Sequence, residues 1–171
     1  MRVVDECSEF IRKGKYDLIV GLGGGGSLDT GKAAAIMGTR QGSVREICGM
    51  ALAYPIGTEF HQNHGRSNGI VLPHVVEFNI IGNIRKYGII GSTMGENIQG
   101  LNGLEAAERS VLTVKRLLEM IHISYRLRNY GIPKESIPKL VEGGMKQSRL
   151  FVPNPRNLTQ EDVTAIYTKA W

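Results

Sequence analysis

The spacing of apolar residues changes near residue 49, and this change constrains the fold more than any other feature. From there to residue 171 apolar residues recur every three or four positions, as in an amphipathic helix, and no long stretch alternates as a strand does. Further helices are expected at residues 137–145 and from Thr159, whose side chain suits an N-cap. The longest helix is predicted to end near Gly131 and Pro133, and its apolar face comprises Leu104, Ala107, Val111, Val114, Leu118 and Ile121.

A different pattern precedes this helical block. Residues 3–11 have helical spacing, the short apolar run LIVGL follows them, and the stretch GGGGS then leads into an alanine-rich helix. The pattern of residues 1–48 therefore predicts a truncated α-β-α fragment. The fold class expected for the whole chain is mainly α. A single strand cannot form a sheet alone, so we expect LIVGL to pair across a homo-oligomer.

The glycine loop is the first feature with chemistry in it. Glycines let the backbone approach a phosphate closely, and the N–H groups at the start of the next helix attract the anion. A dinucleotide pyrophosphate fits such a loop, whereas a plain turn between strand and helix is the alternative reading. Ala33 after Lys32 excludes a Walker A loop. The candidate cofactor-binding residues are Gly23, Gly24, Gly25, Gly26, Ser27, Asp29 and Lys32.

Charge and cysteine content narrow the class of partner. The formal net charge is +5, but lysine and arginine are spread along the chain without a basic run, so no nucleic-acid partner is expected. Cys7 and Cys48 are too few for a disulfide scaffold, and they indicate reduced thiols in a cytoplasmic protein. No window holds the long apolar stretch that a membrane span requires, so no membrane partner is expected.

Three blocks of the sequence, in order, resemble the iron-containing alcohol dehydrogenase family. GGGGSLDTGK is similar to that family's GGGSxxDxxK, with Gly26 in place of the serine and with Asp29 and Lys32 matched. ALAYPIG and NHGRSNGIVLPHVVEFN resemble its AHPLG and HGxxNAxxLPHVxxFN, and the C-terminal NPRNLT resembles its NPRxxT. The resemblance implies that residues 1–48 are the remnant of a dinucleotide-binding domain, that residues 49–171 are a helical, metal-binding-type domain, and that a divalent metal lies between the two domains.

The same resemblance indicates that the metal site is incomplete. The family holds its metal with one aspartate and three histidines; the last histidine matches His64, but the one fourteen residues earlier matches Met50. A thioether is a poor ligand for such an ion. The other two ligands belong to a long segment that residues 33–49 are too short to contain. His61 can join His64 only if one helix carries both, while His74 and His122 are expected in helices, His122 half-buried.

The functional expectation follows from that ligand count. The resemblance implies an NAD(P)-dependent oxidoreductase that acts on a small alcohol or aldehyde with iron or zinc. With His64 as the one inherited ligand, we expect this chain to be inactive, to lose the metal, and to bind NAD or NADP weakly. The alternative is a non-catalytic helical module, derived from that family, that associates with itself.

Overall fold

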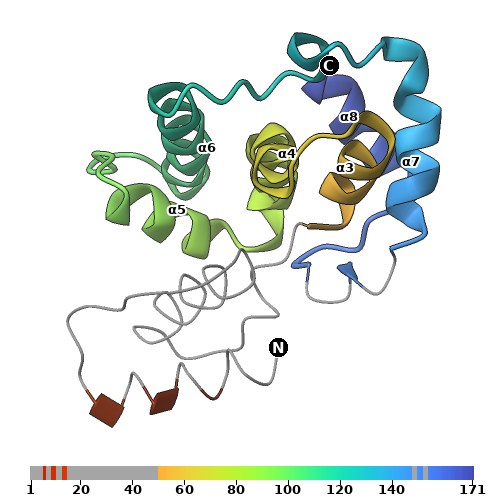
Figure 1. The fold of residues 1–171 in the computed structure, drawn as a ribbon. Coiled ribbons are helices and arrows are strands. Elements are labelled where there is room, and N and C mark those ends of the chain that lie inside the picture. Colours follow the sequence, from red (N-terminus) through yellow and green to blue (C-terminus); the bar gives the residue numbers. More distant parts are fainter. Residues whose placement is uncertain (1–5, 7–8, 11–12, 15–49, 148–149, 152–153) are drawn as a thin grey trace. The chain divides into compact units, whose positions relative to one another are not determined.

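The structure is a computed structural model that describes residues 6, 9, 10, 13, 14, 50–147, 150, 151 and 154–171 (Figure 1). The chain divides into two units, Met1–Cys48 and Gly49–Trp171. In the first unit the described residues are helical, and Lys13 Nζ pairs with Glu9 Oε1 at 2.9 Å. The predicted strand, the glycine loop and the helix after it lie outside the described residues, so the α-β-α fragment stays a prediction.

All regular elements in the described part of the second unit are helices, as the apolar spacing predicts. None of the described helices is long and apolar enough to cross a membrane. The elements in chain order are η2 (Met50–Ala53), α3 (Tyr54–Phe60), α4 (His64–Asn79), η3 (Ile80–Gly82), α5 (Ile84–Thr93), α6 (Gly103–Met120), η4 (Leu127–Tyr130), η5 (Lys134–Ser136), α7 (Ile137–Met145) and α8 (Gln160–Ala170), where η marks a 3₁₀ helix.

Helix α4 is the centre of this unit, with α6 on one side of it and α3 and α8 on the other (Figure 1). It begins after Asn63, whose side-chain oxygen accepts a hydrogen bond from Arg66 N at 2.9 Å and so caps the helix. Its buried residues join η2, α3, α7 and α8 in one hydrophobic core. That core contains Leu52, Ala53, Ile56, Ile70, Val71, Val75, Leu127, Ile132, Ile137, Leu140, Val141, Val163, Ile166, Tyr167 and Ala170.

Helix α6 packs against α5 and α4 and confirms most of its predicted apolar face. Asn102 and Glu105 form a capping box at its start, in which each side chain accepts from the other's backbone N–H. Four of the six predicted face residues are buried, but Leu104 and Ile121 are 46% and 53% exposed. Both lie at the ends of the helix, where the neighbouring helices no longer cover that face.

The predicted end of α6 is wrong. The helix ends at Met120, and Leu127–Tyr130 forms the separate 3₁₀ helix η4, after which Gly131 has a left-handed φ of 70°. The break occurs at His122, which has a left-handed φ of 56°. Its N–H donates to Glu119 O at 3.0 Å, and the next N–H, of Ile123, donates to Leu118 O at 2.9 Å. These two bonds form a Schellman motif, which stops the helix well before the glycine-proline signal.

A glycine on α4 supports this helix end. A Cβ atom at Gly69 would lie only 3.0 Å from Ile123 Cγ2 and 3.3 Å from Leu118 Cδ2. The missing side chain therefore lets the apolar pair of the Schellman motif pack directly on the central helix. Tertiary contact with α4 thus helps to fix where α6 stops.

Replacing His122 by glycine is expected to raise the free energy of unfolding by about 0.5–1 kcal/mol, because glycine adopts the left-handed conformation without the steric cost of a Cβ. Urea denaturation measures this change. His122→Ala is the control, since alanine keeps the Cβ and should bring no gain. A His122→Gly chain no more stable than the His122→Ala chain would contradict a strained helix end.

The C-terminal segment joins the core through two polar contacts. Helix α8 begins with the predicted capping box, in which the Thr159 side chain accepts from Asp162 N and the Asp162 side chain accepts from Thr159 N. The buried Tyr167 hydroxyl donates to Leu52 O, at 2.7 Å, and so ties α8 to η2. Burial raises the pKa of this hydroxyl, so it stays protonated and donates across the whole physiological range.

The NPR stretch before α8 closes the C-terminal end of α4. Asn79 Nδ2 donates to Asn154 Oδ1 at 2.7 Å, and Asn154 Nδ2 donates back to Asn79 Oδ1 at 2.9 Å. Arg156 Nη1 donates to Phe78 O at 2.6 Å, and its guanidinium lies 3.9 Å from the centre of the Phe78 ring. Because this arginine satisfies a carbonyl that the last turn of a helix leaves free, NPRNLT acts here as a structural clamp.

Candidate functional site

His64, the predicted metal ligand, is the first residue of α4 and is exposed to solvent. Asn68 lies one turn later, and its Nδ2 donates to His64 Nε2 at 3.1 Å and to His64 O at 3.0 Å. In this arrangement the lone pair of Nε2 already accepts a hydrogen bond. The imidazole is therefore accessible, but any ion at Nε2 has to displace the Asn68 amide.

His61 does not share a helix with His64. Helix α3 ends at Phe60, and His61 is its C-cap, with a left-handed φ of 53°. Two non-helical residues then separate it from the start of α4. The expectation that one helical face carries both histidines requires an unbroken helix, and the left-handed turn at His61 rules that out.

The donor groups of the described residues do not suit a divalent metal site. Among these residues no three histidine, cysteine, aspartate or glutamate side chains are close enough together to hold an ion. Met50 begins η2, and its thioether is a soft ligand that a hard or borderline divalent ion binds poorly. A protein site for zinc needs at least three protein ligands. The described part of the chain therefore fails this test of fit.

His74 is the one histidine that the structure buries. It lies in α4 directly after Pro73, as predicted, and is only 3% exposed. Its Nε2 is 2.9 Å from Tyr125 O, and since a carbonyl only accepts, Nε2 carries the hydrogen. Burial lowers the pKa of His74 below its ordinary value and outweighs the hydrogen bond to Tyr125 O, which raises it; the cations Arg126 and Lys115 lower the pKa by smaller amounts. The ring is thus neutral near pH 7.

The spacing of apolar residues on α4 is a sequence signal for the burial of His74. Ile70, Val71 and His74 are spaced four and three residues apart, so they share one face of α4, and both apolar members are buried. A histidine at the next position of a buried stripe is expected to be covered as well. Its partner, a carbonyl from a distant loop, has no comparable sequence signal.

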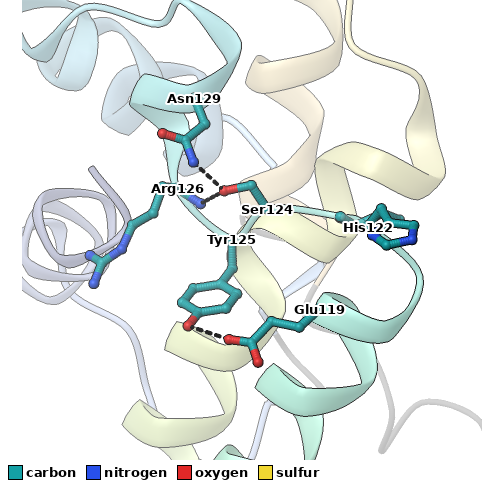
Figure 2. Close-up of a pocket in the computed structure, with 7 residues that line it drawn as sticks. Glu119, His122, Ser124, Tyr125, Arg126 and Asn129 are labelled. Carbon is teal, nitrogen blue, oxygen red and sulfur yellow. Dashed lines mark hydrogen bonds between the residues drawn. The ribbon is translucent and has the colours of Figure 1, made fainter.

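An open pocket lies beyond the C-terminal end of α6 (Figure 2). Its volume is about 360 Å³, and its wall is formed by Glu119, His122, Ile123, Ser124, Tyr125, Arg126 and Asn129. The Tyr125 hydroxyl donates to Glu119 Oε1 at 3.1 Å, and Asn129 Nδ2 donates to Ser124 Oγ at 2.8 Å. His122, expected half-buried inside a helix, is instead exposed after the helix end. His64 is not among the lining residues, so the pocket is separate from the predicted metal position.

The predicted cofactor loop, Gly23–Ser27 with Asp29 and Lys32, lies outside the described residues. Its role in binding NAD or NADP therefore stays a prediction. Among the candidate residues in the described part, only His64 has a defined position, and neither a second nor a third ligand accompanies it in a metal-binding group.

Comparison with known proteins identifies the family of this chain. The C-terminal model of the Fe-containing alcohol dehydrogenase family matches residues 29–171. The chain belongs to this family. The 1,3-propanediol dehydrogenase of Klebsiella pneumoniae is 36% identical over 121 residues, which are 71% of this chain and 31% of that protein. The lactaldehyde reductase of Escherichia coli K12 is 33% identical over 147 residues, 86% of this chain and 38% of that protein.

Solved structures of two relatives confirm the helical fold of the matched part. A 1,3-propanediol oxidoreductase superposes with a TM-score of 0.67 and 35% identity, over 71% of this chain and 32% of that chain. An alcohol dehydrogenase from Oenococcus oeni gives a TM-score of 0.71 and 27% identity, over 85% of this chain and 37% of that chain. The matched part thus covers 31% to 38% of the length of these four relatives.

Proposed function

We propose that this chain supplies the helical domain of an NAD(P)-dependent oxidoreductase for small alcohols or aldehydes, and that the 171-residue chain does not catalyse this reaction unaided. The solitary position of His64 carries the proposal. Its imidazole is exposed at the start of α4, and within the described part it belongs to no group of three metal-ligating side chains. Membership of the iron-containing alcohol dehydrogenase family supports the reaction class.

The names of the relatives support the substrate and cofactor classes. They include a 1,3-propanediol dehydrogenase, a long-chain-alcohol dehydrogenase and a lactaldehyde reductase, which point to alcohols and aldehydes. Both an NAD-dependent methanol dehydrogenase and an NADPH-dependent butanol dehydrogenase match, so either dinucleotide is compatible. We propose that Gly23–Ser27, with Asp29 and Lys32, bind the pyrophosphate weakly, and that the protein works in the cytoplasm, where Cys7 and Cys48 stay reduced.

Alcohol-dependent formation of NADH in the presence of iron(II) or zinc tests this proposal. We expect no turnover above the rate without protein, because one exposed imidazole cannot hold the ion as tightly as three or four protein ligands do. Met50→His should not restore activity. It adds one ligand, but the family's aspartate and first histidine still have no counterpart in the resemblance. Turnover that requires the metal and disappears in His64→Ala would overturn the proposal.

A second candidate function, a helical module that associates with itself, is favoured by apolar side chains at the surface of α5 and α6. Ile89, Met120 and Ile121 are 50%, 71% and 53% exposed. Light scattering after gel filtration separates this candidate from the first. A dimer or larger oligomer that Met120→Glu converts to a monomer supports the module, whereas an oligomer unaffected by this change places the contact elsewhere.

A further inference from the structure

His74 connects the central helix to an irregular segment of the second unit. Residues 121–126 join the end of α6 to η4, and Tyr125 O in this segment accepts the hydrogen bond from His74 Nε2 at 2.9 Å. The same segment forms much of the pocket wall in Figure 2, including Tyr125 and Arg126. One buried side chain of α4 thus contacts a segment in which residues 123–126 belong to no helix or strand.

The second ring nitrogen of His74 has no partner. Nδ1 is buried and forms no hydrogen bond. It is the bare nitrogen of a neutral imidazole, because Nε2 carries the hydrogen. A proton added at Nδ1 creates a buried N–H without an acceptor and a buried positive charge, and both are costly away from water. The buried position of the ring thus favours the neutral form and opposes the charged one.

The charged groups around His74 add to this preference. Two elements packed against it bring cations, Lys115 from α6 and Arg126 from the segment itself, and both lie over the Tyr125 ring, at 5.7 and 5.8 Å from its centre. The one nearby anion is Glu77, one turn later on α4, and its Oε1 pairs with Lys169 of α8. Glu77 favours the charged ring, but its effect on the pKa of His74 is smaller than that of either cation.

We propose that His74 is a pH-sensitive latch, which holds residues 121–126 on α4 while its imidazole is neutral and releases them when the imidazole is protonated. Lifting this segment lets water reach the ring and moves Arg126 away from it. The pocket wall opens with the segment. This device is independent of the proposed oxidoreductase function, because neither His64 nor the glycine loop takes part in it.

The direction of the pH dependence follows from the burial of the ring. A released, solvated His74 has the ordinary pKa of about 6.5, whereas the latched ring has a lower one. The latched state is therefore fully favoured above about pH 6.5 and loses stability as the pH falls from there toward the lower pKa. Because one proton is linked, the closed-to-open ratio changes by at most about tenfold per pH unit.

Hydrogen exchange of the full chain between pH 7.5 and 5.5, corrected for the intrinsic rate, tests the latch. We expect protection of Ile123 N–H to fall by up to about tenfold per pH unit below pH 6.5, while amides inside α8 stay protected. His74→Gln keeps an N–H donor for Tyr125 O but cannot titrate, so its protection should not depend on pH. His61→Gln, at an exposed histidine, is the matched control and should behave like the original chain.

Nitrogen NMR of the imidazole rings is a second test. It uses the unsubstituted chain, so it does not depend on the folding of a variant. We expect His74 to be the Nε2–H tautomer and to titrate below the ordinary pKa of a histidine. Arg126→Gln removes one of the opposing cations, so it should move the titration of His74 and the release to higher pH. The latch is refuted if His74 titrates at or above the ordinary histidine pKa of about 6.5, or if the pH dependence of exchange persists in His74→Gln.

Discussion

Replacing Tyr167 by alanine is expected to lower the free energy of unfolding by about 3–5 kcal/mol, which is a large part of the 5–15 kcal/mol that holds a typical domain folded. Tyr167 is fully buried in the core between α8, α7 and η2. Alanine leaves a cavity where the ring was, and it also leaves Leu52 O without its hydrogen bond. Urea denaturation followed by circular dichroism measures the loss.

Two further variants separate the contribution of the lost hydrogen bond from that of the cavity, and the effect of burial from that of residue type. Tyr167→Phe keeps the ring and removes only the hydroxyl, so it should cost about 1–3 kcal/mol. Tyr54→Ala changes the same residue type at a side chain that is 44% exposed, so its cost should be well below that of Tyr167→Ala. Equal losses at Tyr54 and Tyr167 would show that α8 does not pack on η2 in solution.

Replacing Asn154 by alanine is expected to cost about 2–4 kcal/mol, because it removes the two hydrogen bonds that join the side-chain amides of Asn79 and Asn154. Asn79 is only 3% exposed, so water cannot easily take that place. The same measurement of urea denaturation applies. Asn129→Ala is the matched control, since Asn129 is exposed and makes its hydrogen bond at the surface, and it should cost less than about 1 kcal/mol.

A double-mutant cycle tests whether the two asparagines act as a pair. If they do, the double change Asn79→Ala with Asn154→Ala should destabilise clearly less than the sum of the single changes, with a coupling of about 1–3 kcal/mol. Additive effects would mean that the two hydrogen bonds between these side chains contribute little to stability. In that case the NPR stretch would not be the clamp on α4 that the hydrogen bonds describe.

Helix positions were predictable where a local signal coincided with an apolar face. Thr159 and Asp162 start α8 as a capping box, and residues 137–145 form α7 as their spacing predicts. The end of α6 was not predictable, because a histidine rather than a glycine takes the left-handed position and the glycine-proline signal belongs to the next short helix. Packing of Leu118 and Ile123 on Gly69 helps to decide that end, and such packing leaves no trace in the local sequence.

The candidate site was predictable in part for the same reason. The resemblance predicts His64 as the one inherited ligand and Met50 as a substituted one, and the structure has them at the starts of α4 and η2. It could not show that His61 turns left-handed and so separates α3 from α4. The contact of His74 with Tyr125 O joins residues 51 positions apart, and no spacing rule reaches that far.

The metal content of the purified chain tests the central claim most directly. The chain is incubated with iron(II) or zinc, desalted, and analysed by elemental mass spectrometry beside His64→Ala. Because the described residues hold no group of three ligating side chains, we expect well under one ion per chain and no difference between the two proteins. One ion per chain that disappears in His64→Ala would contradict the account, and it would mean that a complete metal site forms around His64.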